Sequence, residues 1–474
     1  MAHDLSIVQA STLRQSRMRS VVTFAVFFLA VLGIVLLSGG KPRFFIDDAR
    51  AYDLIAHSLL ERGSLEFYEE RAGEWSYASR EPVFPMFLAG LYAIFGNSPY
   101  AVLFVQAALL AFFLVCLGLF LSRRLGAAAG LAAVAVLVAT PGFALMAGQY
   151  QAEMLFTALL GFAVLSCAKA FEKKSASGFF VAGVLLSLAI GTRAVVFFLP
   201  VALAALGAFH LKRQGFSARR ILGFLALFLF ASYSVSAAWT ARNYVRYGIF
   251  QPVSSSGGVV AAIHAEKVHL SGQDLRAYIT SVFLGDYIAE RIFPFYASRK
   301  VAIEQNRSVK ELEGDLRRAG MADYDQDRFF REMTGKNFRA RPFAYLAHNL
   351  LEIVKLNTPM RYDQASLRNL FSGSPSSLWK IAVSILVRVT MLTALFCVCC
   401  GLWVSFRRKE AALLILALPL IYANVVLSFF DLVPRFALPS YPYYAVFGAI
   451  GALTIFPALR RFLESSVYFP ARTS

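Results

Sequence analysis

The residues best placed for chemistry are two neighbouring carboxylates, Asp47 and Asp48, which follow the first strongly apolar stretch of the chain. A charged side chain at the centre of a bilayer costs about 2.5 to 3.5 kcal/mol on insertion scales. Acids this close to a membrane segment are therefore either hydrated just outside it or functional. The first alternative is the polar start of a loop. The second is a carboxylate that takes a proton from a hydroxyl group, as a general base does.

Arginines predicted at the outer edges of membrane segments form a second set of candidates. They are Arg80, Arg193, Arg242 and Arg435. A planar guanidinium donates to two phosphate oxygens at once, and near a membrane surface it stabilises negative charge that develops on a leaving phosphate. The alternative for each of the four is an ordinary one, in which the side chain extends to lipid headgroups.

The composition indicates that a membrane bundle must position these side chains. Hydrophobic residues make up 58% of the chain and charged residues only 16%, which is too apolar for a domain surrounded by water. The net charge of +18 does not indicate nucleic acid, because Lys and Arg gather in short clusters between apolar runs and in one long polar segment. All five cysteines lie in apolar runs, so neither disulfides nor a zinc site is predicted.

Apolar runs predict ten membrane segments, near residues 21–37, 84–121, 125–145, 151–168, 178–191, 194–211, 221–240, 379–405, 411–430 and 437–458. The first is expected to remain as a span, since it lacks a convincing cleavage site for a signal peptidase. The turns assigned to the inner side all carry Lys or Arg, namely Arg123-Arg124, Lys173-Lys174, Lys212-Arg213 with Arg219-Arg220, Arg407-Arg408-Lys409 and Arg460-Arg461. By the positive-inside rule both termini are cytoplasmic. Glu153, in an outer turn, is interpreted as a charge that favours a helix start.

Three parts follow from this pattern. Residues 1–240 form an N-terminal membrane module whose acidic first outer loop, residues 39–82, holds the catalytic candidates. Residues 241–378 form an outer loop subdomain, and residues 379–474 supply the last membrane helices. A helical stretch from Asp327 to Leu356 interleaves apolar and basic residues, so it either lies on the membrane surface or packs on the rest of the loop.

Short motifs carry a family resemblance. The segment Asp48-x-x-x-Tyr52-x-x-Ile55-Ala56 is followed by a proline-containing stretch at residues 77–85. Further motifs come in order: Ile190-Gly191-Thr192-Arg193, Ala238-Trp239-Thr240-Ala241-Arg242-Asn243, the loop 248–258, the stretch 338–346 and Arg435-Phe436-x-Leu438-Pro439-x-x-Pro442. Together they resemble the C-type glycosyltransferases, which use lipid-phosphate-linked sugars and include protein O-mannosyltransferases and the aminoarabinose transferases of lipid A. Ala194 and Ala238 stand where that family usually has proline, and Glu81 where relatives often have a basic residue or proline.

The resemblance implies an all-α polytopic membrane protein with the C-type glycosyltransferase fold. It implies transfer of one sugar, with inversion, from a polyprenyl-phosphate donor to a lipid, glycan or protein acceptor at the outer face of the membrane. Because the chain is compact and carries no large appended luminal domain, we expect that membrane to be a bacterial inner membrane. Asp48 would be the catalytic base beside Asp47, with Arg80, Arg193, Arg242 and Arg435 on the donor phosphate and Tyr52, Glu81 and Asn243 contacting substrate. We expect no resident metal or other cofactor; a divalent cation at Asp47 and Asp48 is the alternative.

Two other functional classes compete with this interpretation. A transporter or flippase of lipid-linked saccharide would use intramembrane charges to guide a headgroup, but paired half-repeats with broken helices are not detected and the candidates gather on one face. No Walker-type phosphate loop is present in the sequence. A non-catalytic scaffold of the cell envelope would leave the ordered acidic and arginine motifs unexplained.

Overall fold

The computed structural model describes residues 48–69, 74–76, 79–140, 150–254, 257–270, 272–305, 307–357, 377–430 and 434–466, with isolated residues between 25 and 33 and Phe143. This part of the chain is almost entirely helical, which confirms the predicted all-α class. Among the described residues, four helices are long and apolar enough to cross a membrane, six if two bent pairs are counted, and four more are apolar but shorter. The predicted first span, 21–37, lies mostly outside these residues, so the count of ten remains a prediction.

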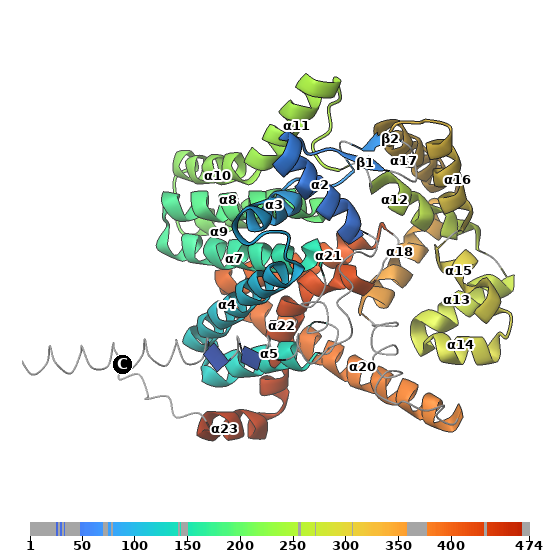
Figure 1. Ribbon diagram of the computed structural model, residues 1–474. Helices are drawn as coiled ribbons and strands as arrows, with labels where there is room; N and C mark the ends of the chain where they lie inside the picture. Colours follow the sequence, from blue (N-terminus) through green and yellow to red (C-terminus); the bar gives the residue numbers. More distant parts are fainter. Residues whose placement is uncertain are drawn as a thin grey trace, which may run out of the picture.

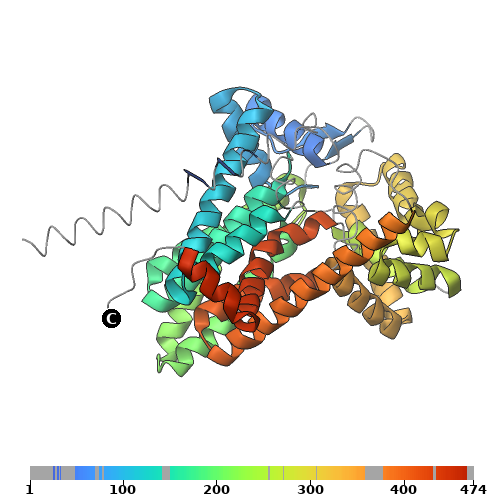
Figure 2. The same ribbon diagram turned by 90° about the horizontal axis from the view of Figure 1, so that it is seen from below.

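The membrane helices form a bundle that fills the left and centre of Figure 1 and extends to its lower right. Within it α7 packs on α4 and α8, and α8 packs on α10, which contacts α9. The bounds of these helices are α4 (Pro99–Leu125), α7 (Ala152–Lys173), α8 (Ala176–Thr192), α9 (Leu199–Arg213) and α10 (Ala218–Ser232). A second group comprises α5 (Ala127–Ala139), α20 (Ser377–Arg408), α21 (Ala411–Leu427) and α22 (Tyr441–Ile455), and α21 joins the two groups through α7 and α9. Figure 2 shows α20 and α22 side by side, seen from below.

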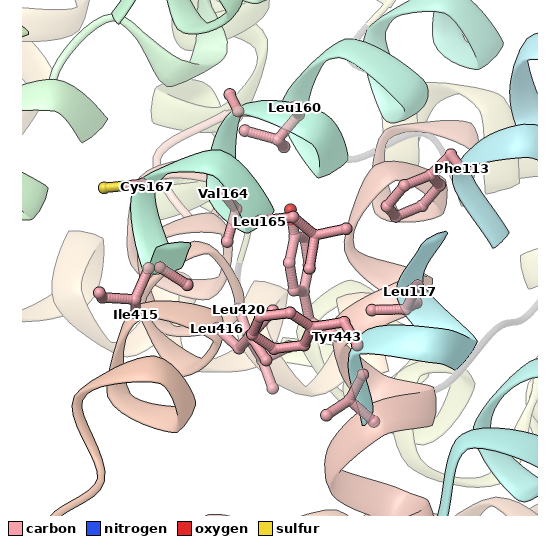
Figure 3. Close-up of a cluster of buried hydrophobic side chains, with 14 of the residues drawn as sticks. Phe113, Leu117, Leu160, Val164, Leu165, Cys167, Ile415, Leu416, Leu420 and Tyr443 are labelled. Atoms are coloured by element: carbon pink, nitrogen blue, oxygen red, sulfur yellow. The ribbon is translucent and has the colours of Figure 1, made fainter. Parts of the chain in front are cut away.

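The apolar core lies where α4, α7, α21 and α22 meet, and Figure 3 shows Phe113 and Leu117 facing Leu160, Val164 and Leu165 there. Leu416, Leu420 and Tyr443 close the same cluster from the C-terminal helices. Since lipid is as apolar as these side chains, close packing rather than exclusion of water holds such helices together. A Cβ atom added to Gly451 would overlap the carbonyl oxygen of Cys397, so the backbones of α22 and α20 touch.

The two ends of α7 identify opposite faces of the bundle. Near its last turn, Arg124 of α4 forms ion pairs with Glu172 of α7 and, at 2.8 Å, with Glu410 just before α21. These helix ends are ones that the charge pattern assigns to a common side. A helix of 22 residues rises about 33 Å, close to the thickness of the hydrocarbon core. Residues at the start of α7 therefore lie about the thickness of the hydrocarbon core away from Arg124.

Two predicted membrane segments are broken in the structure. Segment 84–121 consists of α3 (Val83–Phe95) and α4, separated at Gly96, whose φ of 69° ends the first helix. Segment 221–240 bends by 49° between α10 and α11 (Ser234–Tyr247), so helix continues past the predicted boundary at 240. The bend has a local cause, because Ser187 of α8 accepts a hydrogen bond from the Val235 amide at 2.9 Å, inserting a side chain into the helix ladder.

The loops predicted to lie on the outer side carry most of the remaining elements, mostly on the right of Figure 1. The others are η1 (Ala194–Val196), between α8 and α9, and α23 (Pro457–Ser466), which follows α22. The first loop contains α2 (Asp48–Arg62) and two antiparallel strands, β1 (Phe67–Glu69) and β2 (Glu74–Ser76). The long-loop subdomain, as the structure describes it, runs through α12 (Gly257–Glu266), η2 (Lys267–His269), α13 (Gly272–Leu284), α14 (Asp286–Ile292), α15 (Tyr296–Gln305), α16 (Arg307–Arg318), α17 (Asp323–Ala340) and α18 (Pro342–Asn357). The predicted helix 327–356 is thus two helices, divided at Arg341 because Pro342 follows it.

Candidate active site

Asp48 and Arg80 form an ion pair at the entry to the bundle. Asp48 is the first residue of α2, and Arg80 lies just before Pro82, which precedes the first residue of α3. The Arg80 Nη2 atom is 2.8 Å from Asp48 Oδ1, and the two side chains are 24% and 25% exposed. The positive end of the α2 dipole also favours a charged Asp48. The carboxylate predicted as the base is therefore accessible and held by one of the predicted phosphate-binding arginines.

A second ion pair, between Glu153 and Arg193, lies deeper. Arg193 follows the last turn of α8, Glu153 lies in the first turn of α7, and Arg193 Nη2 is 2.6 Å from Glu153 Oε1. The Glu153 side chain is only 2% exposed. The guanidinium also lies over the ring of Phe436, 5.1 Å from its centre, which brings η3 (Pro434–Ser440) to the same place. Sequence reasoning gave Glu153 only a helix-start role; this buried partnership was missed.

Glu81 connects three separate segments. Its Oε1 atom accepts hydrogen bonds from the Ala194 amide at 3.2 Å and from the Ser254 hydroxyl at 2.7 Å. The carboxylate thereby holds the turn that follows Arg193 against the loop that follows α11. Predicted as a substrate contact, Glu81 has a structural task in this arrangement: it fixes the backbone beside Arg193.

Tyr52 lies buried beneath these charges, with its ring edge-on to Phe84 at 4.9 Å. Burial raises the pKa of the Tyr52 phenol, while Arg193 and Arg80 lower it and Asp48 and Glu81 raise it. Tyr52 is therefore neutral at physiological pH and lies within electrostatic reach of the whole cluster. The arrangement brings the carboxylates of Asp48, Glu81 and Glu153 around two guanidinium groups.

Arg242 and Asn243 belong to a neighbouring cluster on α11. Arg242 donates to Asn243 Oδ1 at 2.7 Å and to Glu66 Oε1 at 3.4 Å, and it stacks over Trp239 at 4.7 Å from the ring centre. The Asn243 side chain donates to the Gln251 carbonyl at 3.3 Å and is buried. Asn243 therefore anchors the loop after α11, and Arg242 is held by groups from α11 and from the segment before β1.

The long-loop subdomain lies close to the Asp48–Arg80 ion pair. The Ser76 hydroxyl donates to Asp323 Oδ2 at 2.7 Å and lies 2.6 Å from the hydroxyl of Ser79, the residue before Arg80. On α16, burial raises the pKa of Glu313, and Arg317, Lys310 and Arg80 lower it. The first turns of α17 and the C-terminal half of α16 thus lie close to Arg80.

Two predicted site residues cannot be placed. Asp47 lies outside the described residues, and so does the side chain of Arg435, although its backbone lies in η3. Within the described part of the chain, no group of three or more His, Cys, Asp or Glu side chains is arranged to hold a metal ion. The alternative of a divalent cation on Asp47 and Asp48 involves an undescribed residue and remains open as a prediction.

Comparisons with known proteins agree with the resemblance predicted from the motifs. Residues 79–239 match a family model described as dolichyl-phosphate-mannose-protein mannosyltransferase. This range contains Arg80, Glu81, Glu153 and Arg193, whereas Asp48 and Arg242 lie outside it. Among curated proteins, none matches significantly.

Solved structures provide the comparison of folds. The archaeal oligosaccharyltransferase AglB from Archaeoglobus fulgidus, in complex with an inhibitory peptide and a dolichol-phosphate, is 15% identical with a TM-score of 0.51, covering 97% of this chain and 53% of its own. ArnT from Cupriavidus metallidurans is 14% identical in both of its structures. Bound to undecaprenyl phosphate it has a TM-score of 0.38, covering 91% of this chain and 77% of its own. In the apo state it has a TM-score of 0.35, covering 92% of this chain and 78% of its own.

The family match and the similarity to AglB support one another. The chain spans about half the length of AglB, and at 15% identity the similarity concerns the fold alone. The family match independently covers α3 through α10 and the start of α11, together with Arg80, Glu153 and Arg193. This chain is therefore an all-α polytopic membrane protein with the fold of the C-type glycosyltransferases, the superfamily that its motifs resemble.

Proposed function

We propose that this protein transfers a sugar from a polyprenyl-phosphate-linked donor to an acceptor hydroxyl at a membrane surface. The observation that carries the proposal is the accessible Asp48–Arg80 pair beside the buried Glu153–Arg193 pair. A carboxylate for the proton and two guanidinium groups for the phosphate are what this reaction requires. The description of the matched family names a dolichyl-phosphate sugar, and AglB was solved with a dolichol-phosphate.

The proposed reaction moves one proton and releases one leaving group, the lipid phosphate. The acceptor oxygen attacks the anomeric carbon from the face opposite the donor phosphate, and the bond from that carbon to the phosphate oxygen breaks with its electrons going to the phosphate. The hydroxyl proton passes to Asp48, and the configuration inverts. Arg80 and Arg193 stabilise the charge that develops on the departing lipid phosphate.

The ion pair of Asp48 with Arg80 implies an order of events. A carboxylate oxygen that accepts from a guanidinium is less available to an acceptor hydroxyl, and Asp48 Oδ1 accepts from Arg80 at 2.8 Å. A lipid phosphate bound at Arg80 competes with Asp48 for that guanidinium. Donor binding thereby releases the Asp48 carboxylate, so the base becomes available when a donor is present.

The same geometry supports an outward-facing site. Asp48, Arg80 and Glu153 lie near the first residue of α7, and the basic end of α4 lies near its last turn. Applying the positive-inside rule, we place the basic ends and both termini in the cytoplasm and the site on the outer face of a bacterial inner membrane. Asp47, Arg242 and Arg435 are proposed as additional residues around the donor, and the acceptor is a lipid, a glycan or a protein.

The decisive experiment uses the full-length protein in lipid nanodiscs. Synthetic polyprenyl-phosphate sugars are offered to the wild type, to Asp48→Asn and to Asp53→Asn, while binding of undecaprenyl phosphate is measured separately. Asp53 is a matched control on the same helix, because its carboxylate accepts a hydrogen bond from Tyr92 at 2.6 Å. We expect Asp48→Asn to slow transfer by about 10² to 10⁴-fold, the usual contribution of a general base.

Binding separates the two roles of Asp48. Asp48→Asn removes one charged group that competes with the lipid phosphate for Arg80, so this variant should bind undecaprenyl phosphate about tenfold more tightly, which corresponds to one charge-assisted hydrogen bond. Wild-type transfer rates in Asp48→Asn would exclude it as the base. Lipid-linked sugar that crosses the bilayer uncleaved would replace the transferase proposal with the transporter.

A further inference from the structure

Helix α18 buries polar side chains and exposes apolar ones, which is the reverse of what is expected for a helix in a loop subdomain surrounded by water. The side chains at positions 345, 348, 349 and 352, which share one face, are Tyr, His, Asn and Glu, and all are at most 5% exposed. The opposite face carries Phe343, Leu346 and Leu350, which are 84%, 48% and 66% exposed. A helix in water normally buries its apolar stripe and exposes its polar one. This pattern suits an apolar environment on the outer side of α18.

Polar contacts with neighbouring helices hold the buried face of α18 in this orientation. Glu352 forms an ion pair with Lys267 of η2 at 2.8 Å and accepts a hydrogen bond from the Tyr278 hydroxyl of α13. One turn earlier, the Asn349 amide lies 2.6 Å from His264 Nε2 of α12. Rotating α18 to bury Phe343 and Leu350 would expose an ion pair that is now 1% and 0% exposed and break these bonds.

The helix is fastened to the end of a membrane helix. Tyr345 lies against Phe429, just beyond the last turn of α21, with 6.3 Å between ring centres. At the other end of α18, the Asn357 side chain donates to Asn424 of α21 at 2.6 Å. Helix α18 thus packs on α21, which has exposed apolar side chains of its own, Ile421 at 40% and Val425 at 52%.

Charges at the start of α18 identify the kind of apolar environment. Arg339 and Arg341 are exposed and immediately precede the apolar face. Cations beside an apolar helix face match lipid, whose phosphates lie just outside its acyl chains. A second protein copy would also cover apolar residues, but α18 packs on α21, an apolar helix whose exposed side chains Ile421 and Val425 suit contact with lipid.

We propose that α18 is an interfacial helix whose Phe343, Leu346 and Leu350 insert among the acyl chains of membrane lipid. It anchors the long-loop subdomain to the bilayer next to α21. The proposal depends on the membrane fold alone, so it stands or falls separately from the transferase proposal. It also resolves the alternatives for the helical stretch 327–356, because α17 packs on α12 while α18 faces lipid.

Photo-crosslinking tests the proposal directly. The full-length protein carries p-benzoylphenylalanine at Leu346 or Leu350 and is irradiated in nanodiscs of phosphatidylethanolamine and phosphatidylglycerol, and adducts are identified by intact mass. The same group at Phe396, exposed on α20, is the positive control, and at Arg328, exposed on α17, the negative control. These positions are on the surface, so folding is preserved, and elution as a single species checks it.

The identity of the crosslinked molecule decides between lipid and protein as the partner of α18. We expect lipid adducts at positions 346 and 350 with yields similar to position 396 and about tenfold above position 328. Adducts to a second protein chain at 346 and 350 would show that this face is a dimer contact and would overturn the proposal. Adducts at 396 without adducts at 346 and 350 would overturn it as well, since lipid would then be absent from α18.

Discussion

The two arginines of the candidate site differ in how their carboxylate partners are surrounded. The side chain of Asp48, the partner of Arg80, is 25% exposed, whereas Glu153, the partner of Arg193, is 2% exposed. An ion pair near water exchanges partners at little cost, but separating a buried pair leaves a charge without compensation. Arg80 is therefore suited to exchange Asp48 for a phosphate, and Arg193 to remain fixed.

This difference predicts the effect of neutralising Glu153. Glu153→Gln leaves the Arg193 guanidinium without its counter-charge and should lower the free energy of unfolding by about 3 kcal/mol or more. The matched control is Glu172→Gln at the other end of α7, where the side chain is 38% exposed and pairs with Arg124. That change should cost at most about 1 kcal/mol. Thermal unfolding in nanodiscs, followed by tryptophan fluorescence, compares the two, and equal losses would contradict the distinction between them.

Residue types and motifs were sufficient to predict some of the site but not its pairings. Asp48, Arg80 and Arg193 were identified because their motifs and their positions at segment edges are visible in the sequence. The pair of Arg193 with Glu153 was not, because it depends on α7 packing against α8 so that the start of one meets the end of the other. Glu66 and Arg242 are more distant still in sequence, and they meet only through the path of the first loop.

Single elements were predictable where composition alone defines them. The apolar run near 379–405 corresponds to α20, and the run at 411–430 to α21. The bend at Tyr233 and the reversed polarity of α18 were not predictable, because each depends on a partner from elsewhere: Ser187 in the first case, and Lys267 and His264 in the second. Periodicity locates a helix, but only its neighbours determine which face is buried.

The crossing of α20 and α22 gives a prediction at the scale of elements. A Cβ atom at Gly451 would overlap the backbone of Cys397, whereas at Gly448, one turn away, it would meet only Val398 at 3.6 Å. Gly451→Ala should therefore force the helices apart and cost about 1 to 3 kcal/mol, and Gly448→Ala should be tolerated. Thermal unfolding of both variants in nanodiscs measures this. Equal melting temperatures for the two would show that the helices do not meet as closely as the glycines imply.

At the scale of the whole molecule, the bundle and the long-loop subdomain differ in what stabilises them. The bundle is held by apolar packing around α7, and the subdomain has a buried polar network at its centre. The two are joined by the Ser76–Asp323 hydrogen bond near the site and by Asn357, Asn424 and Tyr444 at the end of α18. As the pH falls, the subdomain should therefore lose stability before the bundle does.

The effect of pH on the stability of the subdomain follows from two titratable groups of its buried polar network, His264 and Glu352. Burial lowers the pKa of His264 to about 4, with Lys267 and His348 acting in the same direction and Glu352 and Asn349 opposing it. A histidine that is neutral when folded takes up a proton on unfolding below about pH 6.5, so stability is lost as the pH falls from about 6.5 toward 4. Burial by itself raises the pKa of Glu352, yet Lys267 and Lys355 lower it to about 2, so its contribution is lost only below about pH 4.5.

Hydrogen exchange of the full-length protein in nanodiscs, corrected for the intrinsic effect of pH, measures this loss by region. Between pH 7.5 and 5, His264 alone should reduce the protection of α12 and α18 by a few tens of fold, or about 2 kcal/mol, while α7 and α21 stay unchanged. His264→Gln keeps a group that can hydrogen-bond to Asn349 but cannot be protonated, so its protection should vary much less over this range. If the wild type and His264→Gln lose protection equally on acidification, the sensitivity lies in another group, and the buried network does not control the stability of the subdomain.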